Sequence, residues 1–264
     1  MFKFISFGSG SCGNCYYIYT EHDGLLIDVG VGTRSLKKHF GDYGLHMPGG
    51  FSSILVTHDH ADHIKSVGNL SKKLNLPVYA TRLVHSGMDN NYCMKLKLAQ
   101  ANRHYVVKGE SFEASGFHIT PFGVPHDSSD NVGYSIEYEG VVFTLLTDVG
   151  HITEEMKAII RNTDYLVIEA NYDLQMLQNG PYPRHLQERI QCGTGHLSNA
   201  QCGAALVENY TERLKHIWLC HLSEENNHPE LARKSIEQAL SDAGIKVKLD
   251  VLRRKQPTGV FELV

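Results

Sequence analysis

No segment of this sequence is long and apolar enough to cross a membrane. A spanning helix needs about 20 predominantly apolar residues, and no run in the chain approaches that length. Residues 1–8 alternate as a strand does and lack the apolar centre of a signal peptide. We therefore expect a cytoplasmic protein with no membrane contact.

The sequence also lacks an excess of positive charge. Its 25 Lys and Arg residues are outnumbered by 29 Asp and Glu residues, which gives a formal net charge of −4. This balance excludes a protein that binds nucleic acid through its overall charge, but it leaves room for a local basic strip.

A disulfide framework is absent as well. The six cysteines do not follow the spacing of a small secreted domain, and a chain of 264 residues can bury a core without crosslinks. Cys12 and Cys15 form a CxxC pair, but this pair precedes a strand instead of opening a helix. We interpret it as a tight turn with incidental thiols rather than a redox or zinc pair.

Neither a low-complexity linker nor a break in composition divides the chain. We therefore expect residues 1–264 to form a single domain. Residues 149–220 carry a continuous pattern of strands and helices, which leaves no space for a separate cap domain.

Periodicity predicts the regular elements. Alternating or continuous apolar segments predict strands at 2–7, 15–20, 24–29, 54–56, 77–80, 104–107, 116–122, 132–139, 141–147, 165–168, 217–220, 246–251 and 260–263. Helical patterns cover 33–40, 62–74, 153–161, 183–191, 198–210 and 228–242, and the segment 81–103 is compatible with helix or loop. Two strand-rich halves, each followed by helices, predict an α/β protein with two packed sheets and helices outside, a four-layer αββα sandwich.

A histidine-rich turn follows the strand at 54–56. It contains four side chains of the types that divalent transition metals favour: His58, His60, Asp62 and His63. His58 and His60 are two residues apart and point the same way from extended backbone, whereas Asp62 and His63 lie on the next turn and can face a second ion. The alternative is a polar turn that is merely rich in histidine, but the spacing favours metal binding.

Three later strands also end in a possible ligand: His126, Asp148 and His221. Taken singly, a histidine or aspartate at a strand end is more often a capping or hydrogen-bonding group. Together with the histidine-rich turn they complete a set of seven, enough for two ions with Asp148 bridging them. Nitrogen and carboxylate ligands without a thiolate suit Zn²⁺ or Mn²⁺.

This order of motifs resembles the metallo-β-lactamase superfamily over nearly the whole chain, in particular the branch of the YycJ and WalJ proteins. Further segments carry the same resemblance: 9–16, 28–30, 179–183, 195–199 and 221–227. The sequence departs from the family pattern at Cys12, where a serine is expected. The resemblance implies the αββα fold and a metal-dependent nuclease, with 5′-to-3′ exonuclease activity on DNA.

The resemblance also implies roles for the site residues. It assigns one ion to His58, His60 and His126, the other to Asp62, His63 and His221, and the bridging position to Asp148. Asp62 is expected to hold the attacking hydroxide and accept its proton.

Two further residues, Glu169 and His196, resemble motifs of ribonuclease Z, in which the histidine protonates the leaving oxygen and the glutamate orients it. His196 has two alternatives, a hydrogen bond at the start of a helix or a ligand role in place of His221. We prefer His221 as the ligand because it ends a strand, whereas His196 opens a helix.

Three functions are compatible with this sequence. The leading one is a two-metal phosphodiesterase acting on DNA, because an alkoxide leaving group benefits from the Glu169–His196 pair. The second is a hydrolase of a small phosphodiester or thioester, since the fold does not determine the substrate. The third is a non-catalytic zinc protein, although structural zinc needs only four ligands. The segments 172–189 and 253–255 are either phosphate contacts or solvated surface.

Overall fold

Two seven-stranded sheets form the centre of the molecule in the computed structural model, which describes residues 1–47 and 49–264. The first sheet has the order β14 (Phe261–Leu263), β1 (Phe2–Gly8), β2 (Cys15–Tyr19), β3 (Gly24–Ile27), β4 (Ser53–Leu55), β5 (Val78–Ala80) and β6 (Arg103–Tyr105). The second has the order β13 (Lys248–Val251), β12 (His216–Cys220), β11 (Tyr165–Glu169), β10 (Val141–Leu146), β9 (Val132–Tyr138), β8 (Phe117–Gly123) and β7 (Phe112–Ala114).

Each sheet is antiparallel in one half and parallel in the other. In the first sheet β1, β2 and β3 pair antiparallel, and β3 to β6 pair parallel. In the second, β7 to β10 pair antiparallel and β10 to β13 parallel. Because parallel strands end at the same edge of a sheet, β3 and β4 deliver their following residues to one place, as do β10, β11 and β12.

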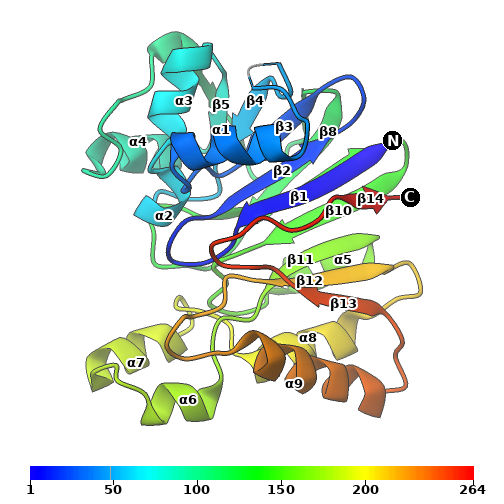
Figure 1. Cartoon of the computed structure of the whole chain (residues 1–264). Coiled ribbons are helices and arrows are strands. Elements are labelled where there is room, and N and C mark those ends of the chain that lie inside the picture. The colour runs from blue at the N-terminus through cyan, green and yellow to red at the C-terminus, as the bar shows by residue number, and fades with distance from the viewer. Residues whose placement is uncertain (48) are drawn as a thin grey trace.

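Helices cover the outer face of each sheet. The first sheet carries α1 (Thr33–Asp42), α2 (Ala61–Ile64), α3 (Val67–Leu74) and α4 (Arg82–Asn90). The second carries α5 (Glu154–Arg161), α8 (Asn199–Asn209) and α9 (Pro229–Asp242), with the short α6 (Leu174–Asn179) and α7 (Arg184–Gln191) to one side. Figure 1 shows the resulting layers, and this arrangement confirms the predicted αββα sandwich.

Three apolar cores hold these layers together. Large aromatic side chains fill the space between the sheets, including Phe4, Phe143 and Trp218. Separate apolar clusters lie between each sheet and its helices. Cys220, which precedes a predicted ligand, is fully buried in the central core, as strand alternation predicts.

The helix predicted at 62–74 is two helices. After α2, the backbone N–H of Ser66 donates to the carbonyl of Val29 at 2.9 Å. This hydrogen bond replaces one within the helix, so the helix is interrupted next to the residues that follow β3. This long-range hydrogen bond has no signature in local sequence. The ambiguous segment 81–103 begins with α4, capped by the Thr81 hydroxyl.

The six-residue helix α6 was not predicted, although Asp173 caps it by accepting from the Met176 N–H at 2.9 Å. It is too short to show a helical period. Among the described residues, no helix has the length and apolarity needed to cross a bilayer.

A glycine fixes how β3 approaches α2. A Cβ atom built on Gly30 lies 1.6 Å from the carbonyl oxygen of Asp62. No change of side-chain rotamer can relieve this overlap, because the position of a Cβ atom and of a carbonyl oxygen is fixed by the backbone. We expect Gly30→Ala to lower the free energy of unfolding by about 3 kcal/mol or more. The measurement is chemical denaturation followed by circular dichroism.

Gly41→Ala is the matched control. Gly41 lies within α1, and a Cβ atom at this residue would have no neighbouring atom within 4 Å. This substitution should raise stability by about 0.5–1 kcal/mol, because alanine favours helix over glycine. Equal stability of the two variants would contradict the close packing of Gly30 on Asp62.

Candidate metal centre

The strand ends deliver their polar residues through an unusual backbone conformation. Asp28 after β3, Asp148 after β10 and His221 after β12 have φ angles of 58°, 55° and 52°, in the left-handed region. A non-glycine residue in this region costs on the order of 1–3 kcal/mol and persists where the surroundings enforce it. Three such residues in one place make this edge of the two sheets the candidate functional site.

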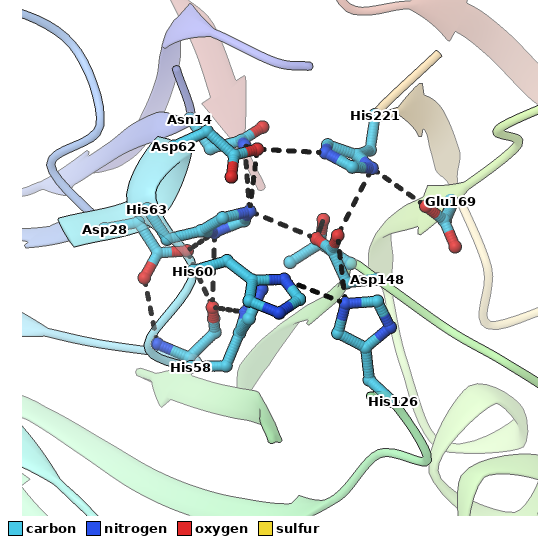
Figure 2. A network of polar contacts seen from close by, with 12 residues as sticks. Asn14, Asp28, His58, His60, Asp62, His63, His126, Asp148, Glu169 and His221 are labelled. Carbon is cyan, nitrogen blue, oxygen red and sulfur yellow. Dashed lines mark hydrogen bonds and ion pairs between the residues drawn. The ribbon is translucent and has the colours of Figure 1, made fainter. Parts of the chain in front are cut away.

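All seven predicted ligands converge here (Figure 2). His58, His60 and His126 form one group whose ligand atoms lie within 4.8 Å of one another. A second group with the same spacing consists of Asp62, His63 and His221.

Asp148 lies between the two groups. Its Oδ2 is 3.2 Å from His63 Nε2 in the second group, and its Oδ1 is 3.7 Å from His126 Nε2 in the first. This is the place expected for a bridging carboxylate. That these residues hold ions stays a prediction.

The ring nitrogens that face away from the centre are anchored. His63 Nδ1 donates to Asp28 Oδ2 at 2.7 Å, and His126 Nδ1 donates to the Gly195 carbonyl at 3.0 Å. His221 Nδ1 lies 2.9 Å from Glu169 Oε1. A hydrogen bond at one ring nitrogen fixes the tautomer and leaves the other nitrogen as a metal ligand. The Nε2 atoms of these three rings are therefore directed to the shared centre.

Asp28 supports the histidine-rich turn, and the sequence alone gave it no role. Its buried carboxylate accepts from the Thr57 N–H at 2.9 Å and from the Thr57 hydroxyl at 2.8 Å, besides His63. Asn14 has a similar position, because its Nδ2 donates to Asp62 Oδ2 at 3.1 Å. The signal that was available for Asp28 is its place at the end of a buried strand, the same signal that identified Asp148.

The site concentrates negative charge without a basic side chain. Asp28, Asp148 and Glu169 are almost completely buried, and no lysine or arginine among the described residues lies within 4 Å of them. Burial lowers the pKa of His63, but the nearby carboxylates of Asp148 and Asp28 outweigh it and raise this pKa to about 10. The same buried negative charge favours a cation at this place.

The donor set fits divalent metal ions. Burial lowers the pKa of the His58 and His126 imidazoles, which keeps these rings neutral, the form that binds a metal. His58 Nε2 is buried and has no hydrogen-bond partner among the described residues. A buried nitrogen without a partner is costly unless a ligand occupies the space beside it. Imidazole and carboxylate donors together match the preferences of Zn²⁺ and Mn²⁺.

Glu169 and His196 form a pair beside this cluster. Glu169 Oε1 lies 2.9 Å from Nδ1 of His196 as well as from Nδ1 of His221, and Oε2 accepts from the N–H groups of Val149 and Leu197. Burial acts to lower the pKa of His196, and the Glu169 carboxylate outweighs it, so this pKa lies above its ordinary value.

His196 faces a cavity and adjoins the cluster. Its Nδ1 is 3.9 Å from Asp148 Oδ1. A cavity of about 160 Å³ opens beside its ring, with Ser11, Asn171 and Ser223 among the residues that line it. The structure therefore brings together the Glu169–His196 pair, the seven possible ligands and an adjacent cavity.

The sequence matches a family and named relatives. The model of the β-lactamase superfamily domain matches residues 25–217. Exodeoxyribonuclease YycJ of Bacillus anthracis is 34% identical over 239 residues, which cover 90% of this chain and 89% of that protein. Exodeoxyribonuclease WalJ of Streptococcus pneumoniae is 34% identical over 249 residues, which cover 94% and 92% of the two chains.

Solved structures share the fold at lower identity. The metallo-β-lactamase fold protein YhfI of Bacillus subtilis superposes with a TM-score of 0.72 at 17% identity, over 99% of both chains. Zn²⁺-bound PqqB of Methylobacterium extorquens gives 0.74 at 18% identity, over 99% of this chain and 100% of that one. Human tRNase Z, short form, gives 0.65 at 16% identity, over 99% of both.

Removing the negative charge of Asp28 should weaken metal binding. In Asp28→Asn the side chain keeps its shape but loses the charge that orients His63. Outer-sphere carboxylates of this kind contribute about 10–100-fold to metal affinity. We expect the dissociation constant of the weaker ion to rise by about that factor, as measured by competition with a chromogenic chelator. An unchanged constant would show that the Asp28–His63 contact is only structural.

Metal content distinguishes the two candidate histidines for the last ligand position. His221→Ala should lose one bound ion, because His221 Nε2 faces Asp62 Oδ2 at 3.4 Å. His196→Ala should keep its full content. Inductively coupled plasma mass spectrometry of desalted protein measures both. Full occupancy in His221→Ala would overturn its assignment as a ligand.

Proposed function

The chain belongs to the β-lactamase superfamily, and from this membership we propose that it is a metal-dependent hydrolase that cleaves DNA from strand ends. The matches confirm the resemblance inferred from sequence motifs. The two named relatives, both called exodeoxyribonucleases, support DNA as the substrate because they match this chain over at least 90% of its length.

We propose two ions, Zn²⁺ or Mn²⁺, held by the seven converging side chains. His58, His60 and His126 would hold one, Asp62, His63 and His221 the other, and Asp148 would contact both. When bound, two such ions lower the pKa of a water molecule and neutralise charge that develops on the phosphate.

Asp62 is suited to orient the attacking water and accept its proton. Its side chain is about one quarter exposed, at 23%, so one face is open to the substrate. Asn14 Nδ2 holds Oδ2 at 3.1 Å, which fixes the direction of the carboxylate. Burial acts to raise the pKa of Asp62, but His63 and His221 outweigh it and lower this pKa to about 2, so the group is ionised at neutral pH.

The placement of His196 carries the proposal for a phosphodiester substrate. Its Nδ1 is held by Glu169, and its Nε2 has no protein partner among the described hydrogen bonds, so this atom is available to a leaving group. An alkoxide leaves poorly without a proton, whereas the thiolate released from a thioester leaves without one. A general acid beside a two-metal site therefore favours phosphodiester hydrolysis.

Two broader properties belong to the same proposal. We infer that residues 1–264 act without a separate cap domain, so loops near the cavity must recognise the substrate. We also infer a cytoplasmic location, because all six cysteines are free and unpaired thiols are typical of reducing compartments.

Replacing His196 should affect substrates according to their leaving group. We expect His196→Ala to lower kcat for end-labelled DNA by about 10²–10⁴-fold, the usual contribution of a general acid. Hydrolysis of bis(p-nitrophenyl) phosphate should change little, because p-nitrophenolate leaves without protonation. Steady-state kinetics with Mn²⁺ or Zn²⁺ measure both reactions.

His118→Ala is the control for this prediction, because His118 lies on the exposed side of β8 and Glu113 is its one ion-pair partner among the described residues. It should leave both activities unchanged. Equal losses on the two substrates in His196→Ala would contradict the proton-donor role. Turnover of the small phosphodiester without any cleavage of single- or double-stranded DNA would favour the small-molecule alternative.

A further inference from the structure

Two hollows flank the beginning of α1. One, of about 390 Å³, lies between the start of α1, the end of α2 and the segment 93–96. The other, of about 330 Å³, lies between α1, the turn at Cys12 and the segment 254–255. Gly32 borders both, so the two hollows adjoin, and we call their combined lining the α1 rim.

Only cationic and neutral residues line the α1 rim. Its first hollow contains Arg34, Lys65 and Lys95, and its second contains Lys38, His39, Arg254 and Lys255. No aspartate or glutamate is present in either lining. Because acidic residues outnumber basic ones in the whole chain, this segregation concentrates positive charge far above the average for the molecule.

Most of these cations lack an ion-pair partner. Among the described residues, Arg34, Lys38, Lys65 and Lys95 have no carboxylate within 4 Å, so no direct ion pair neutralises their charge. Within the rim Lys255 is the exception, as it pairs with Glu224 at 2.8 Å. Unneutralised cations in a concavity are the electrostatic pattern of an anion-binding surface.

Another hollow provides a contrast. The hollow between α9 and β13, of about 680 Å³, also contains three lysines, Lys215, Lys246 and Lys248. It includes Glu212 and Glu237 in the same lining, so acidic side chains offset most of its positive charge. None of the candidate site residues lines it. The α1 rim therefore differs from this hollow in having cations without acidic side chains in its lining.

The α1 rim adjoins the candidate metal centre at two points. Lys65 is two residues after His63, in the turn that ends α2. Arg254 Nη1 donates to the Ser223 carbonyl at 2.5 Å, two residues after His221. Figure 1 shows the red segment before β14 passing beside the blue loop after β1, and the Ser9 N–H donates to the Arg253 carbonyl at 3.1 Å there.

We propose that the α1 rim binds the phosphate backbone of the DNA strand whose end lies in the metal centre. This rests on the proposed function for the substrate but adds where the uncleaved strand is held. The contact is to phosphates rather than bases, because the one phenylalanine of the lining, Phe7, is buried beneath His39 and offers no exposed stacking surface. Binding should therefore be independent of sequence and sensitive to salt.

Charge reversal tests the α1 rim. The triple variant Arg34→Glu, Lys65→Glu, Lys95→Glu changes three exposed cations of the first hollow. Its control, Lys234→Glu, Lys246→Glu, Lys248→Glu, changes three exposed lysines on α9 and in and just before β13, so the net charge changes by the same amount in both variants. Fluorescence anisotropy with metal-loaded protein and a phosphorothioate single strand, which resists cleavage, reports binding alone.

The salt dependence gives the expected size of the effect. Each phosphate contact to a single strand contributes about 0.7 to the slope of log Kd against log salt, so losing three contacts should lower the slope by about 2. Kd should rise about tenfold or more in the rim variant and change much less in the control. Equal effects in the two variants, or an unchanged slope in the rim variant, would overturn the proposal.

Cysteine protection in the unmodified protein gives a test that does not depend on how a variant folds. Cys12 and Cys93 lie in the two hollows, and Cys192 is an exposed cysteine outside both. Bound single-stranded DNA should slow alkylation of Cys12 and Cys93 by N-ethylmaleimide several-fold more than that of Cys192. Equal rates with and without DNA at a saturating concentration would contradict the α1 rim.

These measurements separate the two proposals. Wild-type protein that binds the strand through the α1 rim but cleaves no DNA would refute the proposed hydrolysis and keep the binding surface. Cleavage of DNA with full activity in the rim variant, on long and short strands alike, would refute the surface and keep the hydrolysis. Absence of DNA binding by the wild type would refute the surface directly.

Discussion

Buried negative charge is the constraint on which the rest of this site depends. Asp28, Asp148 and Glu169 lie almost entirely out of water, where an uncompensated carboxylate costs several kcal/mol. No basic side chain of the described residues reaches them, so imidazoles and backbone N–H groups must surround them. The histidine-rich turn and the ends of β10, β11 and β12 supply these partners. The geometry of the site is thus the geometry required to keep three carboxylates buried.

The backbone bears part of the cost of this arrangement. Asp28, Asp148 and His221 all have positive φ angles where their strands end. Glycine would adopt these angles without strain. Side chains with this strain are retained when the functional group is needed at that point. The surrounding hydrogen bonds enforce it: the His221 N–H donates to Ser9 Oγ at 2.9 Å, and Asn131 Nδ2 donates to the Asp148 carbonyl at 2.9 Å. The site is therefore largely preorganised by the protein itself.

The local sequence predicted the possible ligands better than it predicted the residues that hold them in place. The seven possible ligands were predictable because each follows an apolar strand, and parallel strands bring their ends together whatever the details of packing. The supporting residues depend on long-range contacts: the Ser66 N–H donates to the Val29 carbonyl, and Glu169 Oε1 lies 2.9 Å from His221 Nδ1. Such pairings have no period and no fixed spacing, so one sequence does not reveal them. For Asp28, the position at the end of a strand can be recognised in the sequence. Its contact with His63 cannot, because the two residues are 35 positions apart.

One short turn separates the two regions proposed to contact DNA. Ser11 lines the cavity beside His196, and the next residue, Cys12, lines the second hollow of the α1 rim. A strand held on both sides must therefore cross the turn at residues 10–13, which consists of small residues only. At Gly13, φ is 148° and a Cβ would lie 2.7 Å from the Gly30 carbonyl, so the turn can pack closely against the chain after β3 only if that residue is glycine. The packing that positions Asn14 on Asp62 thus also leaves the path between cavity and rim open.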